Sequence, residues 1–169
     1  MFLPLVYLCI ITHIVRLIYE ILKHKKVIKA SRISFVIIFS NMLLLWTSWF
    51  LLCSFDPSAT SFPLVLRYFG ISLAILGVII FLTALLTIKT LETYEGDLIT
   101  SGIYSRIRHP MYLGFLLWLI GFPLFYGGTY SLILAIPFAM NVLYWRHLEE
   151  LELDKRFADY KLYKKKTFF

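Results

Sequence analysis

The chain has 169 residues, of which 60% are hydrophobic and 16% are charged, and its mean hydropathy is +0.78. A soluble domain is about half apolar and about a quarter charged, so this composition argues against a soluble class and predicts a single membrane domain. The net charge of +7 would suit a nucleic-acid partner, but its distribution along the chain argues against one. Cys9 and Cys53 lie within apolar runs, which predicts buried thiols rather than a disulfide framework or a metal site.

Five apolar runs predict an all-α integral membrane protein with five transmembrane helices. They cover residues 1–22, 33–53, 64–88, 111–126 and 129–145. Since a helix needs about 20 apolar residues to cross a hydrocarbon core of about 30 Å, the fourth run is short for a span. Pro123 and Pro137 lie inside the last two runs, and Gly127-Gly128 joins them, so we expect a short, proline-broken hairpin. The charged residues that follow predict a cytosolic C-terminal helix.

Small and polar residues within the runs predict how the helices pack. Gly70 and Gly77 would let two helices approach closely, and Asn41 is expected to form an interhelical hydrogen bond rather than bind a ligand. Arg16 and Glu20 are four residues apart and could pair on one helix face. We nevertheless favour the interpretation that Arg16 extends to the membrane surface.

Basic residues orient the protein in the membrane. Of the 17 Lys and Arg residues, all but Arg16 and Arg67 lie in the segments 23–32, 89–110 and 146–166, whereas the connectors 54–63 and 126–129 hold none. The positive-inside rule therefore predicts an N-terminus outside and a cytosolic C-terminus. Topology and anionic membrane lipids then account for the positive charge without nucleic acid.

The polar segments 89–110 and 146–169 should emerge on the same side and flank the hairpin, so we expect them to form one site. Arg108, His109 and Tyr112 directly precede an apolar run, and such a group of donors at a membrane surface suggests a ligand. In the second segment, one set of residues at helical spacing predicts an inward stripe, comprising Leu153, Phe157 and Tyr160. Glu149 and Glu150 extend this stripe, and since a buried carboxylate needs a partner, we favour a ligand role for both.

These segments contain a set of ordered motifs. Residues 98–104 read L-I-T-S-G-I-Y, residues 108–114 read R-H-P-M-Y-L-G, and residues 149–157 read E-E-L-E-L-D-K-R-F. Over residues 66–163 the chain thus resembles the isoprenylcysteine carboxyl methyltransferase family, and motifs in this order are specific. The tail departs from the family at Ala158, where the family has glycine. On this basis we divide the domain into a helix pair (1–65) and a cofactor-binding core (66–169).

The resemblance implies transfer of a methyl group from S-adenosylmethionine at a membrane-embedded site. The family's cofactor residues correspond to Tyr104, Arg108, His109, Tyr112, Gly114, Glu149 and Glu150. Arginine suits the carboxylate of the cofactor, glutamates suit its ammonium or ribose hydroxyls, and aromatic faces suit its adenine or sulfonium.

The resemblance also implies a lipophilic or prenylated acceptor, such as a prenylcysteine-type α-carboxyl, that enters from the bilayer. A carboxylate acceptor needs no general base, and Arg106, Arg108 or Arg146 could orient it; an amine or thiol would need His109 or a glutamate to take its proton. The membrane would be the plasma membrane in a prokaryote or the endoplasmic reticulum in a eukaryote. Two alternatives stay open: a nicotinamide-dependent reductase of sterol-like lipids, and a non-enzymatic adaptor that binds anionic lipid.

Overall fold

The computed structural model describes residues 1–28, 31–59, 62–88 and 97–169, so residues 89–96 of the polar segment lie outside the described part. Its elements are α1 (Phe2–His24), α2 (Arg32–Ser54), α3 (Leu64–Ile88), the 3-10 helix η1 (Gly102–Ser105), α4 (Pro110–Tyr126), α5 (Thr129–Arg156) and α6 (Tyr160–Lys166). The five predicted apolar runs coincide with α1 to α5, except that α5 continues well beyond its apolar part.

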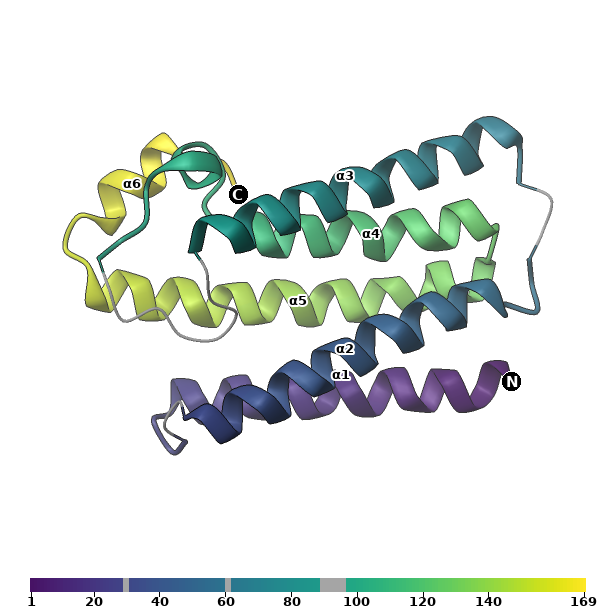
Figure 1. Ribbon diagram of the computed structural model, residues 1–169, viewed down its shortest axis with the longest axis horizontal. Coiled ribbons are helices and arrows are strands. Elements are labelled where there is room, and N and C mark those ends of the chain that lie inside the picture. Colours follow the sequence, from purple (N-terminus) through teal and green to yellow (C-terminus); the bar gives the residue numbers. More distant parts are fainter. Residues whose placement is uncertain (29–30, 60–61, 89–96) are drawn as a thin grey trace.

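Helices α1, α2 and α3 are long and apolar enough to cross a membrane, with 23, 23 and 25 residues, whereas α4 has 17. This length and composition indicate an integral membrane protein. In Figure 1 the N-terminus, the end of α2 and the turn between α4 and α5 lie at one end of the bundle. The end of α3, the start of α4, the end of α5 and all of α6 lie at the other, so residues 97–110 and 146–169 meet, as predicted for the two polar segments.

Glycines bring α3 and α4 into close contact, as predicted for Gly70 and Gly77. A Cβ on Gly77 would lie 2.5 Å from the carbonyl oxygen of Gly114, and a Cβ on Gly121 would lie 2.6 Å from that of Gly70. These distances are too short for any side chain, so the glycines set the spacing of the two helices. Gly114 is therefore part of a helix contact, although its motif position suggested the cofactor.

The connector between α2 and α3 caps the N-terminus of α5. The carboxylate of Asp56 accepts hydrogen bonds from the backbone N–H and hydroxyl of Ser131, at 2.7 and 2.6 Å, and Ser58 Oγ accepts from the N–H groups of Thr129 and Tyr130. These bonds satisfy amide groups that have no partner within the helix, and the negative charge suits the helix dipole.

The short hairpin of α4 and α5 is present, but the prediction that prolines break it was wrong, because both helices continue through their prolines. Pro123 lies in the last turn of α4, and Gly127, in the left-handed conformation with φ 75°, ends this helix by donating to the Pro123 carbonyl at 2.8 Å. Pro137 lies inside α5, where it removes one backbone hydrogen bond without ending the helix.

The predicted single stripe through Leu153, Phe157 and Tyr160 was also wrong. The first helix of the tail ends at Arg156, Phe157 is extended with φ −122° and ψ 116°, and Tyr160 begins α6. The chain thus turns back at Phe157, and Tyr160 reaches the core from a second helix, where it is fully buried.

Two predictions about polar residues in the N-terminal helix pair had different outcomes. Asn41 donates a hydrogen bond from Nδ2 to the carbonyl of Thr12 at 3.1 Å, which confirms an interhelical role. Arg16, however, does not extend to the membrane surface: it is buried, forms an ion pair with Glu20, and its guanidinium lies 5.7 Å from the ring centre of Trp145. Cys9 and Cys53 are buried free thiols, as expected.

Candidate functional site

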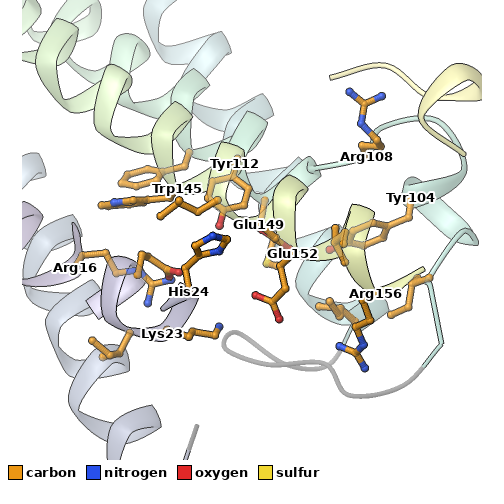
Figure 2. Close-up of a pocket in the computed structure, with 18 of the residues that line it drawn as sticks. Arg16, Lys23, His24, Tyr104, Arg108, Tyr112, Trp145, Glu149, Glu152 and Arg156 are labelled. Atoms are coloured by element: carbon orange, nitrogen blue, oxygen red, sulfur yellow. The ribbon is translucent and has the colours of Figure 1, made fainter. Parts of the chain in front are cut away.

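A cavity of about 190 Å³ opens among α1 to α5 at the end of the bundle where the polar segments meet. One wall is polar or aromatic and includes Arg16, Glu20, Lys23, His24, Tyr104, Arg108, Tyr112, Trp145, Glu149, Glu152 and Arg156. The other wall is apolar and comes mainly from α2 and α3, with Phe35, Ile38, Phe39, Met42, Trp46 and Phe81. Figure 2 shows the cavity between two groups of side chains: on one side lie Arg16, His24, Tyr112 and Trp145, and on the other lie Tyr104 and Arg156.

Behind the polar wall, Glu150 joins the two predicted motifs. Its carboxylate lies 3.3 Å from Arg108 Nε, 3.4 Å from His109 Nε2 and 3.0 Å from Lys164 Nζ. The hydrogen bond to His109 is the main cause that lowers the pKa of Glu150, and it outweighs the opposing effect of burial, with Lys164 adding to the decrease. We expected Arg108, His109 and Tyr112 to lie close to the two glutamates. This is confirmed for Arg108 and for His109, whose Nδ1 also lies 3.9 Å from Glu149, and Tyr112 lines the same cavity as Glu149.

The C-terminal residues lie over Arg108. Its Nη1 donates to the carbonyl oxygens of Lys164 and Thr167, at 3.0 and 2.9 Å, and its backbone N–H donates to Phe168 at 3.0 Å. In Figure 2 the Arg108 guanidinium points away from Glu149 and Tyr112. Arg108 thus connects the tail to the start of α4, although its side chain also contributes to the cavity lining.

Helix α6 closes the site with two buried tyrosines. Tyr163 donates its hydroxyl to the carbonyl of Tyr104 at 2.6 Å, and the Tyr160 hydroxyl lies 3.4 Å from His109 Nε2. Burial raises the pKa of both phenols, so they are neutral at physiological pH. The tail therefore fixes Tyr104 and His109 from behind.

Several buried donors of the cavity residues have no protein partner. Within the described ranges these are Tyr104 Oη, Arg16 Nε, Trp46 Nε1 and Trp145 Nε1. Burial, followed by the nearby charge of Glu149, raises the pKa of Tyr104, so its hydroxyl remains a donor. Buried donors are nearly always satisfied in proteins, so these groups are suited to acceptor atoms of a ligand or of water.

The structure places only part of the predicted site residues in the cavity wall. Tyr104, Arg108, Tyr112 and Glu149 line the cavity. His109 and Glu150 lie behind it in the ion-pair network, and Gly114 contacts α3. Arg146 lies outside the cavity lining, with its guanidinium 4.6 Å from the ring centre of Phe169.

Helix α1 contributes to the cavity, which the sequence motifs did not indicate. Arg16, Glu20, Lys23 and His24 all line the cavity, from a helix that belongs to none of the motifs. The available signal was the pair of ionisable residues inside an apolar run, because such residues in a membrane helix generally face a cavity or a partner.

Comparisons with known proteins place the chain among membrane methyltransferases. Residues 65–160 match the family model for phospholipid methyltransferases. Protein-S-isoprenylcysteine O-methyltransferase B of Arabidopsis thaliana is 37% identical over 90 residues, which cover 48% of this chain and 43% of that protein. The Schizosaccharomyces pombe protein-S-isoprenylcysteine O-methyltransferase is 34% identical over 77 residues, covering 41% of this chain and 30% of the relative.

The chain spans less than half the length of these curated relatives. No solved structure matches it significantly. The family match begins in α3 and ends at the first residue of α6, so it includes Tyr104, Arg108, Tyr112 and Glu149 but not the cavity residues of α1 and α2. The motif resemblance is confirmed, and the chain belongs to the phospholipid methyltransferase family.

Proposed function

We propose that the protein is a membrane methyltransferase that uses S-adenosylmethionine and acts on a lipophilic carboxylate of the prenylcysteine type. The observation that carries this proposal is one cavity with two different walls: the polar wall suits a charged nucleoside cofactor, and the apolar wall suits an isoprenoid chain. Three relatives, two from Arabidopsis thaliana and one from Schizosaccharomyces pombe, are named protein-S-isoprenylcysteine O-methyltransferases. The family match favours this function over a nicotinamide-dependent reductase or a lipid-binding adaptor.

The chemistry of the cavity residues fits this cofactor. Tyr104 Oη and Trp145 Nε1 are buried donors without partners in the described part of the chain, and the cofactor carries hydroxyl, carboxylate and ring nitrogen acceptors. Glu149 suits the ammonium group or the ribose hydroxyls, and the faces of Tyr112 and Trp145 suit a cation. When bound, S-adenosylmethionine supplies an electrophilic methyl group on a cationic sulfonium.

The residues behind the cavity would keep these groups in place. Glu150 holds Arg108 and His109, while Tyr163 fixes the backbone of Tyr104. The side chains of the apolar wall exclude water from the acceptor. A carboxylate acceptor has no proton to lose, so these residues need to supply only orientation and desolvation.

We further propose five membrane spans, with the N-terminus outside and the cavity at the cytosolic face. The distribution of Lys and Arg supports this orientation, since the α4–α5 turn and the described part of the α2–α3 connector hold none. The membrane would be the plasma membrane in a prokaryote or the endoplasmic reticulum in a eukaryote.

Titration of the purified protein with S-adenosylhomocysteine by calorimetry tests the cofactor. Tyr104→Phe removes one hydroxyl without changing the ring, and we expect affinity to fall about 5- to 10-fold, as for one lost hydrogen bond. Tyr144→Phe is a matched control, because Tyr144 lies exposed on α5 and outside the cavity lining. A wild-type protein that binds no S-adenosylhomocysteine, or that binds NADPH and transfers hydride, would refute the proposal.

A further inference from the structure

The cavity contains a buried arginine from outside the family motifs. We propose that Arg16 of α1 binds the carboxylate of the acceptor and thereby determines specificity for acidic lipophilic acceptors. This inference rests on the proposed methyltransferase function and extends it, because it names the residue that recognises the reacting group. Arg16 belongs to the part of the chain that the family match does not cover.

Three other arginines of the polar segments are less suited to this role. Arg156 lines the cavity but is exposed, and its guanidinium lies 5.0 Å from the ring centre of Phe157. The Arg108 guanidinium already contacts Glu150 and the carbonyls of Lys164 and Thr167. Arg146 stacks on Phe169, outside the cavity lining. A carboxylate in the cavity would therefore compete with Glu150 and the tail carbonyls for Arg108, and Arg146 does not line the cavity.

Arg16, by contrast, lies in the cavity wall and retains binding capacity. Only 8% of its surface is exposed, it forms an ion pair with Glu20, and its Nε has no hydrogen-bond partner among the residues that the structure describes. A guanidinium has five N–H donors in a planar fork, so it can hold a second carboxylate beside Glu20. Charged residues inside a membrane helix are costly, which favours a functional role for this one.

The surroundings of Arg16 suit an acceptor with an ionised head and an apolar tail. Its guanidinium packs over Trp145 and Tyr19, with ring centres 5.7 and 5.6 Å away. The same cavity is lined by Ile38 and Met42 of α2, the helix against which α1 packs. A carboxylate bound at Arg16 could therefore place its hydrocarbon chain along α2.

The charge at Arg16 is balanced differently before acceptor binding and after methylation. Glu20 neutralises the guanidinium when no acceptor is present, which lowers the cost of the buried charge. Methylation converts the acceptor carboxylate into a neutral ester that can no longer form an ion pair. The product should therefore bind Arg16 more weakly than the substrate does.

The test measures whether the preference for a ligand carboxylate over its neutral analogue requires Arg16. N-acetyl-S-farnesylcysteine and its carboxamide differ only in that group, and both can be titrated into the full chain in lipid nanodiscs with S-adenosylhomocysteine present. Wild type should prefer the carboxylate at least about 10-fold, because a hydrogen bond between two charged groups is stronger than one to a neutral amide. In Arg16→Gln this preference should fall to about threefold or less.

Matched variants separate charge recognition from folding. Arg16→Lys should keep part of the preference, and Arg67→Gln should keep all of it, because Arg67 donates to the Phe125 carbonyl away from the cavity. If Arg16→Gln does not fold, the Arg16→Lys result decides: a preference equal to that of wild type would overturn the inference. Equal preference in Arg16→Gln and wild type would overturn it as well.

Further outcomes distinguish this inference from the proposed function. Loss of acceptor binding in Glu20→Gln, with Arg16→Gln unaffected, would point to an amine acceptor and refute the role of Arg16. If wild type binds S-adenosylhomocysteine and methylates the carboxylate, but Arg16→Gln keeps its preference, only the inference fails. If wild type neither binds S-adenosylhomocysteine nor methylates any acceptor, the proposed function fails first.

Discussion

Glu150→Gln should destabilise the protein by about 3 kcal/mol. The side chains of Glu150 and Arg108 are only 11% and 10% exposed, and His109 and Lys164 contact the same carboxylate. Removing one member of a buried ion pair costs about 3–5 kcal/mol. The lower end of this range applies here, because Lys164 is 48% exposed and water screens its charge. For a chain of this size, this corresponds to a decrease in Tm of about 6–12 °C.

Thermal unfolding in detergent at several pH values measures this effect. The folded pKa of Glu150 lies below its unfolded value, so the stabilisation is fully present above about pH 4.3 and is lost as the pH falls through the folded value. The difference in Tm between wild type and Glu150→Gln should therefore be constant near neutral pH and shrink in acid. Asp154→Asn serves as a control, because Asp154 is exposed on the same helix. A Glu150→Gln protein with the Tm of wild type at pH 7 would refute the ion-pair network.

Three further substitutions test other parts of the structure. Gly77→Ala should cost about 1–3 kcal/mol in unfolding free energy, because its Cβ would lie 2.5 Å from the Gly114 carbonyl; wild-type stability would refute the close contact of α3 and α4. Asp56→Ala should cost about 1–2 kcal/mol and remove acid sensitivity at that end of the bundle. Burial raises the pKa of the Asp56 carboxyl, but hydrogen bonds from Ser131 and Ser58 lower it by more, so the folded pKa lies below the usual value. The stability that Asp56 gives the protein is therefore lost only as the pH falls below the usual carboxyl range. Tyr163→Phe should cost about 1 kcal/mol, and thermal unfolding that matches the exposed control Tyr144→Phe would contradict the bond to Tyr104.

The sequence predicted the helices well, because apolar runs and their polar ends determine where a membrane helix begins and ends. The run 64–88 matches α3 at both ends, and Gly70 and Gly77 marked the contact with α4. The tail was harder to predict. Helical spacing of Leu153, Phe157 and Tyr160 does not reveal that the backbone turns at Phe157.

The motifs predicted which residues meet, but not which of them face the cavity. Arg108, His109 and the two glutamates do lie together, yet Glu150 is held by Lys164, and Lys164 was not expected there. The sequence did not predict that Arg16 lines the cavity. Its pairing with Glu20 along one helix can be predicted from their spacing, but the packing of α1 against α5 depends on the tertiary structure.

Transfer of a labelled methyl group most directly tests the central claim, which is methylation of a lipophilic carboxylate. The protein in nanodiscs would be incubated with methyl-labelled S-adenosylmethionine and N-acetyl-S-farnesylcysteine, and the organic extract would then be treated with alkali. We predict extractable label that alkali releases as methanol, because a methyl ester is base-labile. Label that stays bound after alkali, or no extractable label at all, would contradict the account.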